Sequence, residues 1–301
     1  MKAFSCTFVA LAVACLAAPV FAALNVFATV PEWGALAQEL GGDKVNVYVA
    51  TSALADPHHV EAKPSLIARA RNADLVLSTG AELEIGWLPL VLQQAGNPKV
   101  QAGKPGYFEA APNVPMLEKP SRLDRAEGDV HPLGNPHIQT DPRNIGRVAT
   151  ALTARLADVD PANAAYYRER GKAFGERWSA AIARWEREAA PLKGVSVIVQ
   201  HKGFPYLTEW LGMKEIAALE PKPGIEPTTS HLSDVLATLE RTPAKMVIRA
   251  AYQSDRASQW IAERAKIHAV VLPFTVGGDD AAKDLFSLFD DTIQRLLKGA
   301  A

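Results

Sequence analysis

The sequence predicts an α/β protein with two lobes of parallel-sheet βα units that are joined by one long spine helix. In both halves of the chain, short β-branched runs alternate with amphipathic helical stretches, which is typical of βαβ units around parallel sheets. Between the halves, residues 161–190 lack a strand signal and repeat apolar side chains at helical spacing. We therefore expect a leader at 1–22, an N-terminal α/β lobe at 23–160, a linking helix at 161–191 and a C-terminal α/β lobe at 192–301.

The first 22 residues have the features of a secretory signal peptide. One basic residue, Lys2, precedes an apolar run over residues 8–18, and a small side chain stands at the expected cleavage site near Ala22. Both cysteines, Cys6 and Cys15, lie in this leader, so the mature chain has no disulfide and no thiolate metal site. We expect a periplasmic protein and favour the free form over a lipid-anchored form that would use Cys15.

Composition excludes several classes of protein. The chain has 32 Lys and Arg against 33 Asp and Glu, a balance that offers no footprint for nucleic acid. Its 48% hydrophobic and 22% charged residues are ordinary for a soluble globular protein. No apolar stretch after the leader approaches the roughly 20 residues that span a bilayer. We expect a soluble monomer.

The expected elements follow in order along the chain. Strands are expected at 24–30, 45–50, 73–79, 195–200, 245–250 and 269–274, and helices at 32–40, 64–71, 86–94, 232–241 and 256–266. The spine helix is predicted to begin with Asp160 as its cap and Pro161 in its first turn, and to end at Pro191. Residues 118–135 are rich in Pro, Gly and acidic residues and predict a long surface loop, which is often functional.

Several metal-binding side chains follow predicted strands. His58 comes shortly after the strand at 45–50, His201 directly follows the strand at 195–200, and Asp279 and Asp280 follow the strand at 269–274. His137 lies between the loop and a helix that opens near residues 141–142. Because ligands of open parallel sheets bind at the carboxyl ends of the strands, we expect these groups to meet in the interdomain cleft.

Three imidazoles and one carboxylate form a tetrahedral set that suits Zn²⁺. We therefore predict a zinc site with His58, His137 and His201, and with Asp279 or Asp280 as the fourth ligand. A site in which a Glu replaced the third His would favour Mn²⁺, but here the third ligand is His201. Either Asp could instead cap the helix that follows.

The remaining histidines are weaker candidates for metal ligands. His131 lies in the loop, six residues before His137, and is a possible accessory ligand that receives metal transiently. His59 is expected to be solvated, and His231 and His268 to be packing or surface residues.

The sequence carries no strong enzyme signature. It has no HExxH pair, no GxSxG elbow and no phosphate-binding glycine loop. A secreted zinc hydrolase remains the alternative from another class, with water as the fourth zinc ligand and Glu61 as the nearest general base. A related two-lobe protein that carries a metal chelate or acts as an adhesin is a second alternative, which should need an aromatic lining rather than converging histidines.

Three segments resemble motifs of the zinc/manganese solute-binding proteins of ATP-binding-cassette (ABC) importers. Residues 56–65 match DPHxxExxPS, residues 135–142 are similar to DPHxWxDP, and the third motif is a His before an aromatic-rich helix start, at 201–207. The chain departs from the second and third motifs at Asn135, Gln139 and Lys202, where the family has Asp, Trp and an acidic residue.

The resemblance implies high-affinity capture of Zn²⁺ and delivery to an ABC permease, with His58 rather than His59 as the first ligand. A manganese-binding member is the alternative within the family. The resemblance also implies two lobes that open modestly when the metal is released, and a periplasmic zinc chaperone as a further partner. The family's final carboxylate usually follows the last strand more closely than Asp279 does, so water is an alternative fourth ligand.

Overall fold

The computed structural model describes residues 23–120, 128 and 131–301. The predicted leader, with Cys6, Cys15 and the cleavage site at Ala22, lies outside the described residues. Of the predicted loop at 118–135, the described residues belong to no helix or strand. Within the described ranges, no helix is both long and apolar enough to cross a membrane.

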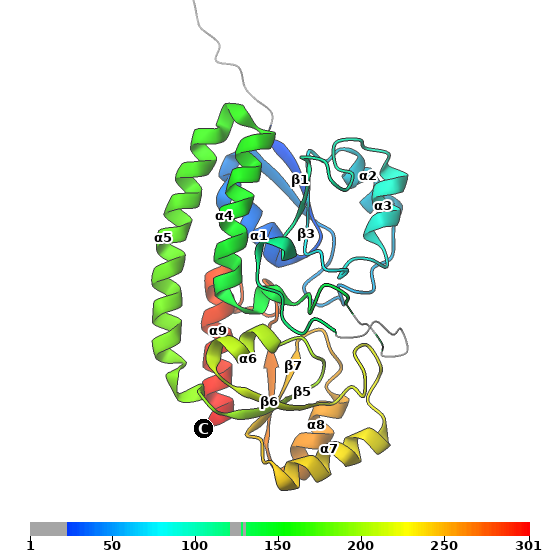
Figure 1. Cartoon of the computed structure of the whole chain (residues 1–301), viewed down its shortest axis with the longest axis vertical. Coiled ribbons are helices and arrows are strands. Elements are labelled where there is room, and N and C mark those ends of the chain that lie inside the picture. Colours follow the sequence, from blue (N-terminus) through cyan, green and yellow to red (C-terminus); the bar gives the residue numbers. More distant parts are fainter. Residues whose placement is uncertain (1–22, 121–127, 129–130) are drawn as a thin grey trace, which may run out of the picture.

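The N-terminal lobe is built on a parallel sheet with the strand order β2-β1-β3-β4. The strands are β1 (Leu24–Ala28), β2 (Val45–Val49), β3 (Leu75–Ser78) and β4 (Tyr107–Glu109), and the helices are α1 (Pro31–Gly41), α2 (Pro64–Arg71) and α3 (Leu88–Ala95). Alternate residues of a strand point to opposite faces. Accordingly, Val26 packs with Trp33 of α1, whereas Phe27 packs in a separate cluster with Leu66 of α2 and Val91 of α3. Helices therefore cover both faces of this sheet (Figure 1).

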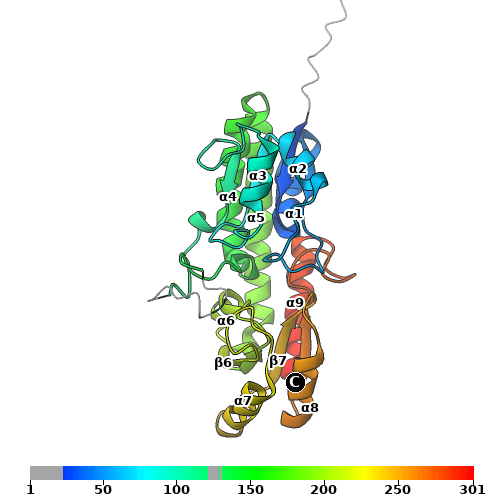
Figure 2. The same ribbon diagram turned by 90° about the vertical axis from the view of Figure 1, so that its right-hand side faces the viewer.

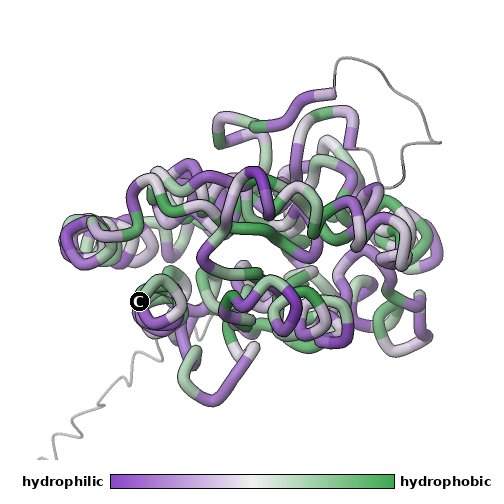
Figure 3. Tube along the Cα trace, turned by 90° about the horizontal axis from the view of Figure 1, so that it is seen from below, coloured by the Kyte–Doolittle hydropathy of each residue, from purple (hydrophilic) through white to green (hydrophobic). Residues whose placement is uncertain are grey.

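The C-terminal lobe repeats this topology with the order β6-β5-β7-β8, again all parallel. The strands are β5 (Ser196–Val199), β6 (Lys214–Ala218), β7 (Met246–Ala250) and β8 (His268–Leu272), and the helices are α6 (Pro205–Leu211), α7 (Thr229–Arg241), α8 (Arg256–Ala265) and α9 (Leu285–Ala300). In the trace coloured by hydropathy, hydrophobic stretches run through the middle and the outer turns are mainly hydrophilic (Figure 3). The matching strand orders show that the two lobes share one topology, although the sequence shows no internal repeat.

Two helices, α4 (Pro142–Val159) and α5 (Ala164–Glu188), connect the lobes. The α5 helix runs alongside both of them (Figures 1 and 2). On its inner face Trp178 and Trp185 pack edge to face at 5.1 Å between ring centroids, and Trp185 lies 5.1 Å from Phe289 of α9. Such aromatic contacts add to the area that these side chains bury. This aromatic column gives the spine one continuous core with both lobes.

The predicted fold class is confirmed, and the details differ at element ends. All six predicted strands are present, but the edge strands β4 and β6 were not predicted. Asp160 does not cap the spine helix, because a 3-10 turn at Pro161–Asn163 intervenes and Asn163 stands at the N-cap of α5. Asp160 instead accepts a hydrogen bond from the Tyr167 hydroxyl at 2.7 Å. The lobe boundaries at 160/161 and 191/192 stay a prediction.

Candidate metal centre

Three of the predicted ligands meet between the lobes. His58 lies between β2 and α2, His137 stands at the N-cap of the 3-10 turn Ile138–Thr140, and His201 comes two residues after β5 ends at Val199. Their ring centroids are 5.1 to 5.8 Å apart. One ring nitrogen from each lies within 4.8 Å of the other two. The carboxyl end of β5 and two loops of the N-terminal lobe thus bring three imidazoles to one point.

The Nδ1 atom of each of these histidines has an oxygen partner. His58 Nδ1 is 2.9 Å from Asp56 Oδ1, His137 Nδ1 is 2.9 Å from Asn135 Oδ1, and His201 Nδ1 is 2.7 Å from Glu220 Oε2. Because these oxygens can only accept, each Nδ1 must donate, which assigns the proton to Nδ1 and leaves the Nε2 lone pair free. Partners of this kind orient the imidazoles that bind metals.

Two of the three Nε2 atoms have no hydrogen-bond partner among the described residues. Within the described part of the chain, His58 Nε2 and His137 Nε2 are buried without a hydrogen bond. A buried polar atom without a partner costs free energy, so such atoms call for a ligand. Around a Zn²⁺ ion with Zn–N bonds of about 2.05 Å, tetrahedral nitrogens would be about 3.4 Å apart. Since one ring nitrogen of each histidine already lies within 4.8 Å of the other two, a small inward movement of the rings is enough to hold the ion.

The protonation of the site favours a metal. Burial holds the pKa of His137 well below its usual range, and the neighbouring His201, His58 and His131 lower it further. A histidine must be neutral to bind a metal, so His137 is ready to bind near neutral pH. Burial acts to raise the pKa of Asp56, but the hydrogen bonds from His58 outweigh it and lower that pKa, which keeps the carboxylate ionised.

Asn135 stands where the resembling family has Asp, and its surroundings explain the amide. Its Nδ2 group donates to Glu118 Oε2 at 3.0 Å and to the Lys202 carbonyl at 2.7 Å. An Asp here would place a carboxylate against another carboxylate and a carbonyl oxygen. The amide therefore orients His137 through Oδ1 and joins the two lobes through Nδ2.

The structure does not bring Asp279 or Asp280 into the group of histidines. Asp279 Oδ1 accepts from the backbone N–H groups of Ala281 and Ala282, at 2.9 and 3.0 Å, and its other oxygen pairs with Arg295 of α9. Asp280 is exposed. Neither residue caps α9, since Asp284 does so in a capping box with Ser287. The fourth-ligand prediction thus has no support in this geometry, because Asp279 is held by its own turn and by Arg295.

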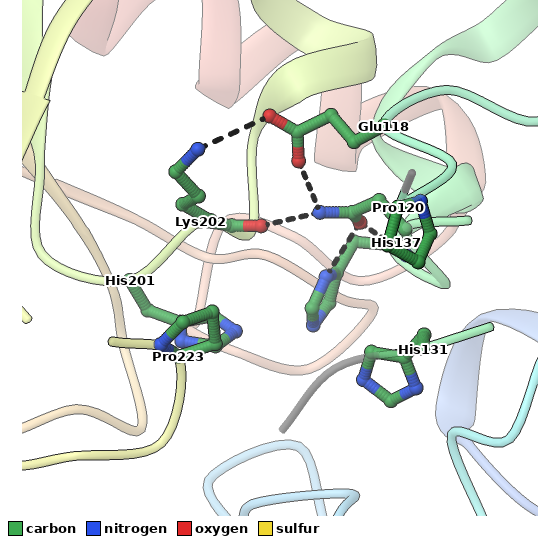
Figure 4. A pocket seen from close by; sticks show the side chains of 8 residues that line it. Glu118, Pro120, His131, His137, His201, Lys202 and Pro223 are labelled. Atoms are coloured by element: carbon green, nitrogen blue, oxygen red, sulfur yellow. Dashed lines mark hydrogen bonds and ion pairs between the residues drawn. The ribbon is translucent and has the colours of Figure 1, made fainter. Parts of the chain in front are cut away.

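The other histidines lie around the site or far from it. His131 lines a cavity with His137 and His201 (Figure 4), and its ring centroid is 5.4 Å from that of His58. It is not one of the three residues whose nitrogens converge. His59 and His268 are exposed, and His231 Nε2 is 2.9 Å from the Ala218 carbonyl oxygen.

Glu220 was missed by the sequence analysis. It follows the edge strand β6, and it lies 19 residues from the histidine that it contacts. The only signal in the sequence was its position after a weakly apolar run in a lobe that alternates strands and helices. Since that run was not recognised as a strand, its carboxyl end could not be placed beside β5.

Two parallel-sheet lobes on a common spine, with three imidazoles converging between them, define a metal-binding solute-binding protein. A family described as zinc-uptake complex component A, periplasmic, matches residues 26–299, and the chain belongs to this family. It is therefore the metal-binding, substrate-binding component of an ABC importer.

Individual relatives differ in the metal that their names give. The chain is 22% identical over 243 residues to the zinc-binding lipoprotein AdcA of Streptococcus pneumoniae, covering 79% of this chain but only 46% of AdcA. It is 21% identical over 283 residues to the manganese ABC transporter substrate-binding lipoprotein ScaA of Streptococcus gordonii, covering 92% of this chain and 89% of ScaA. A crystal structure of ZnuA superposes with a TM-score of 0.78 at 24% identity, over 93% of this chain and all of that one. These likenesses agree on the fold and leave the metal open.

Proposed function

We propose that this protein captures Zn²⁺ in the periplasm with His58, His137 and His201 and delivers it to the permease of an ABC importer. The observation that carries this proposal is the pair of buried Nε2 atoms, on His58 and His137, that have no hydrogen-bond partner among the residues that the structure describes. Three imidazoles match the preference of Zn²⁺ for nitrogen ligands, whereas Mn²⁺ prefers carboxylate and water oxygens. A manganese-binding member of the family is the alternative, because relatives named for both metals resemble this chain.

We propose water as the fourth ligand, since Asp279 is paired with Arg295. His131, whose ring centroid is 5.4 Å from that of His58, is proposed as an accessory residue that contacts the metal transiently beside the three histidines. We further propose a free periplasmic monomer that accepts zinc from a chaperone, a partner that rests on the resemblance alone. The family is one of solute-binding proteins, so the zinc hydrolase alternative has no support from it.

The test is native mass spectrometry of residues 23–301, titrated with Zn²⁺ and Mn²⁺. We expect one tightly bound zinc that manganese displaces poorly, and we expect His137→Ala and His201→Ala each to lose it while remaining folded by circular dichroism. His268→Ala removes an exposed histidine of β8 and is the matched control. If both site variants bind zinc like the unaltered protein, the site is wrong; if manganese is preferred, the metal is wrong.

A further inference from the structure

Two cavities are each lined by two of the three histidines. The first, which we call the loop-side cavity, is lined by Glu118, His131, His137, His201 and Lys202, among others (Figure 4). The second, which we call the acidic cavity, is lined by residues that include Asp56, His58, Gln200, His201, Glu220 and Glu226. His201 lines both, so a cation could approach the same imidazole from either cavity.

The described residues that line the two cavities differ in charge. In the loop-side cavity Glu118 is offset by Lys202, whose Nζ lies 3.5 Å from its carboxylate. The acidic cavity has three carboxylates, and neither Lys nor Arg occurs among the described residues that line it. A cavity lined by one sign of charge raises the local concentration of the opposite ion and its rate of arrival.

Gln200 gives the acidic cavity a second feature that points to a ligand. Its residue is only 5% exposed, and within the described part of the chain its Oε1 atom is buried without a hydrogen-bond partner. It lines the acidic cavity and also an adjoining groove that shares Glu226 and Ser254. A buried carbonyl oxygen without a partner is costly unless a donor or a cation satisfies it.

The size of the acidic cavity fits a hydrated ion. Its volume is about 300 Å³. A divalent cation with six waters needs about 200 Å³, taking roughly 30 Å³ per water and a similar volume for the ion. Carboxylate and amide oxygens accept hydrogen bonds from metal-bound water, so the ion can be held before it loses its hydration shell. Arg256 lines the adjoining groove and is not among the described residues that line the acidic cavity, so its positive charge makes the groove less attractive to a cation than the acidic cavity.

We propose that the acidic cavity is the path by which a hydrated divalent cation reaches the histidines, and that Gln200 and Glu226 bind it on the way. This inference rests on the proposed function, because it presumes that His58, His137 and His201 hold the ion at the end of the path. Asp56 and Glu220 already accept hydrogen bonds from two of these histidines. The groups specific to the path are therefore the exposed Glu226 and the Gln200 side-chain oxygen, which has no partner among the described residues.

The test measures the rates of zinc binding and release by stopped-flow with a fluorescent zinc indicator, together with the equilibrium Kd. A residue that contacts the ion only on the way should change both rates by the same factor and leave the Kd unaltered. For Gln200→Met we expect both rates to fall together. For Glu226→Gln we expect association to slow about threefold at low ionic strength, and less as salt screens the charge.

The matched variant is Lys202→Gln, which makes the loop-side cavity more negative. Unchanged rates in this variant support the proposal, whereas faster association would assign the path to the loop-side cavity and overturn it. Association rates like those of the unaltered protein in both Gln200→Met and Glu226→Gln would also overturn it. If either of these overturning rate results is found while all variants keep tight zinc binding, only the path is wrong; if the unaltered protein binds no zinc, the proposed function itself fails.

Discussion

The hydroxyl of Thr275 donates a hydrogen bond to the carboxylate of Glu32 at 2.6 Å, which joins two residues 243 positions apart. Glu32 lies in the first turn of α1 in the N-terminal lobe, and Thr275 follows β8 in the C-terminal lobe. Both are buried, at 3% and 6% exposure. The pKa of Glu32 is raised to about 7, mainly because the carboxyl group is buried. The hydrogen bond from Thr275 opposes this shift, and the nearby Glu84 carboxylate adds to it. This contact between the lobes therefore changes charge near neutral pH.

We predict that Glu32→Gln stabilises the metal-free protein at pH 8 but not at pH 5. The pKa of Glu32 is raised from 4.5 to about 7 in the folded protein, so its contribution to stability is fully present below about 4.5 and is lost as the pH rises through 7. Gln keeps an oxygen that accepts from Thr275 and carries no charge. The difference in the free energy of unfolding should reach on the order of 3 kcal/mol at pH 8, measured by urea unfolding from pH 5 to 8.

Glu263→Gln makes the same chemical change at an exposed position of α8 and serves as the control. Its stability should follow that of the unaltered protein across the whole pH range. A Glu32→Gln variant that differs from the unaltered protein by the same amount at pH 5 and pH 8 would show that Glu32 does not titrate in this window.

Two glycines of α5 should respond in opposite ways to a methyl group. A Cβ at Gly171 would lie 2.4 Å from Thr153 Oγ1 of α4, whereas a Cβ at Gly175 would meet nothing within 4 Å. Ala has the higher helix propensity, so Gly175→Ala should stabilise the protein by about 0.5 to 1 kcal/mol. Gly171→Ala should destabilise it by about 1 to 3 kcal/mol, because the closely packed helices must move apart.

Thermal and urea unfolding of the two variants, one turn apart on the same helix, separate packing from propensity. The double variant Gly171→Ala, Thr153→Ser removes the Thr methyl group, which would lie 2.6 Å from the new Cβ, and should recover part of the loss. Equal stabilisation by both single substitutions would mean that α4 and α5 pack less closely than the structure shows.

The sequence predicted elements best where the local pattern and the buried surface agree. The α2 helix has the predicted bounds Pro64–Arg71, because Pro starts it at its first turn and apolar residues recur at helical spacing. The inner strand β3 is predictable because it is buried throughout and three of its four residues, Leu75–Leu77, form an apolar run. His58 and His201 were placed near each other from where the predicted strands end, whereas His137 was placed from the motif at 135–142, before a helix start.

The edge strands and the fourth ligand were less predictable. The β4 strand has only three residues, and β6 begins with Lys214 and Glu215, since an edge strand is less buried and needs no apolar run. Asp279 is paired with Arg295 of α9 rather than with the metal site. Tertiary packing places Arg295 beside the turn that contains Asp279. No spacing in the sequence could show that this pair would form.

Replacing Glu220 with Gln should weaken zinc binding without unfolding the protein. Glu220 Oε2 accepts from His201 Nδ1 at 2.7 Å and from the backbone N–H of Gly224 at 2.8 Å. The amide oxygen of Gln can accept both bonds, so His201 keeps its orientation, but the loss of negative charge makes Nε2 a weaker base. Changes at such partners typically cost about 10- to 100-fold in metal affinity. Competition with a chelator of known affinity measures the Kd, and Glu209→Gln, at an exposed position of α6, is the control. A Kd within about twofold of the unaltered protein in Glu220→Gln would mean that the carboxylate positions His201 without strengthening it as a ligand.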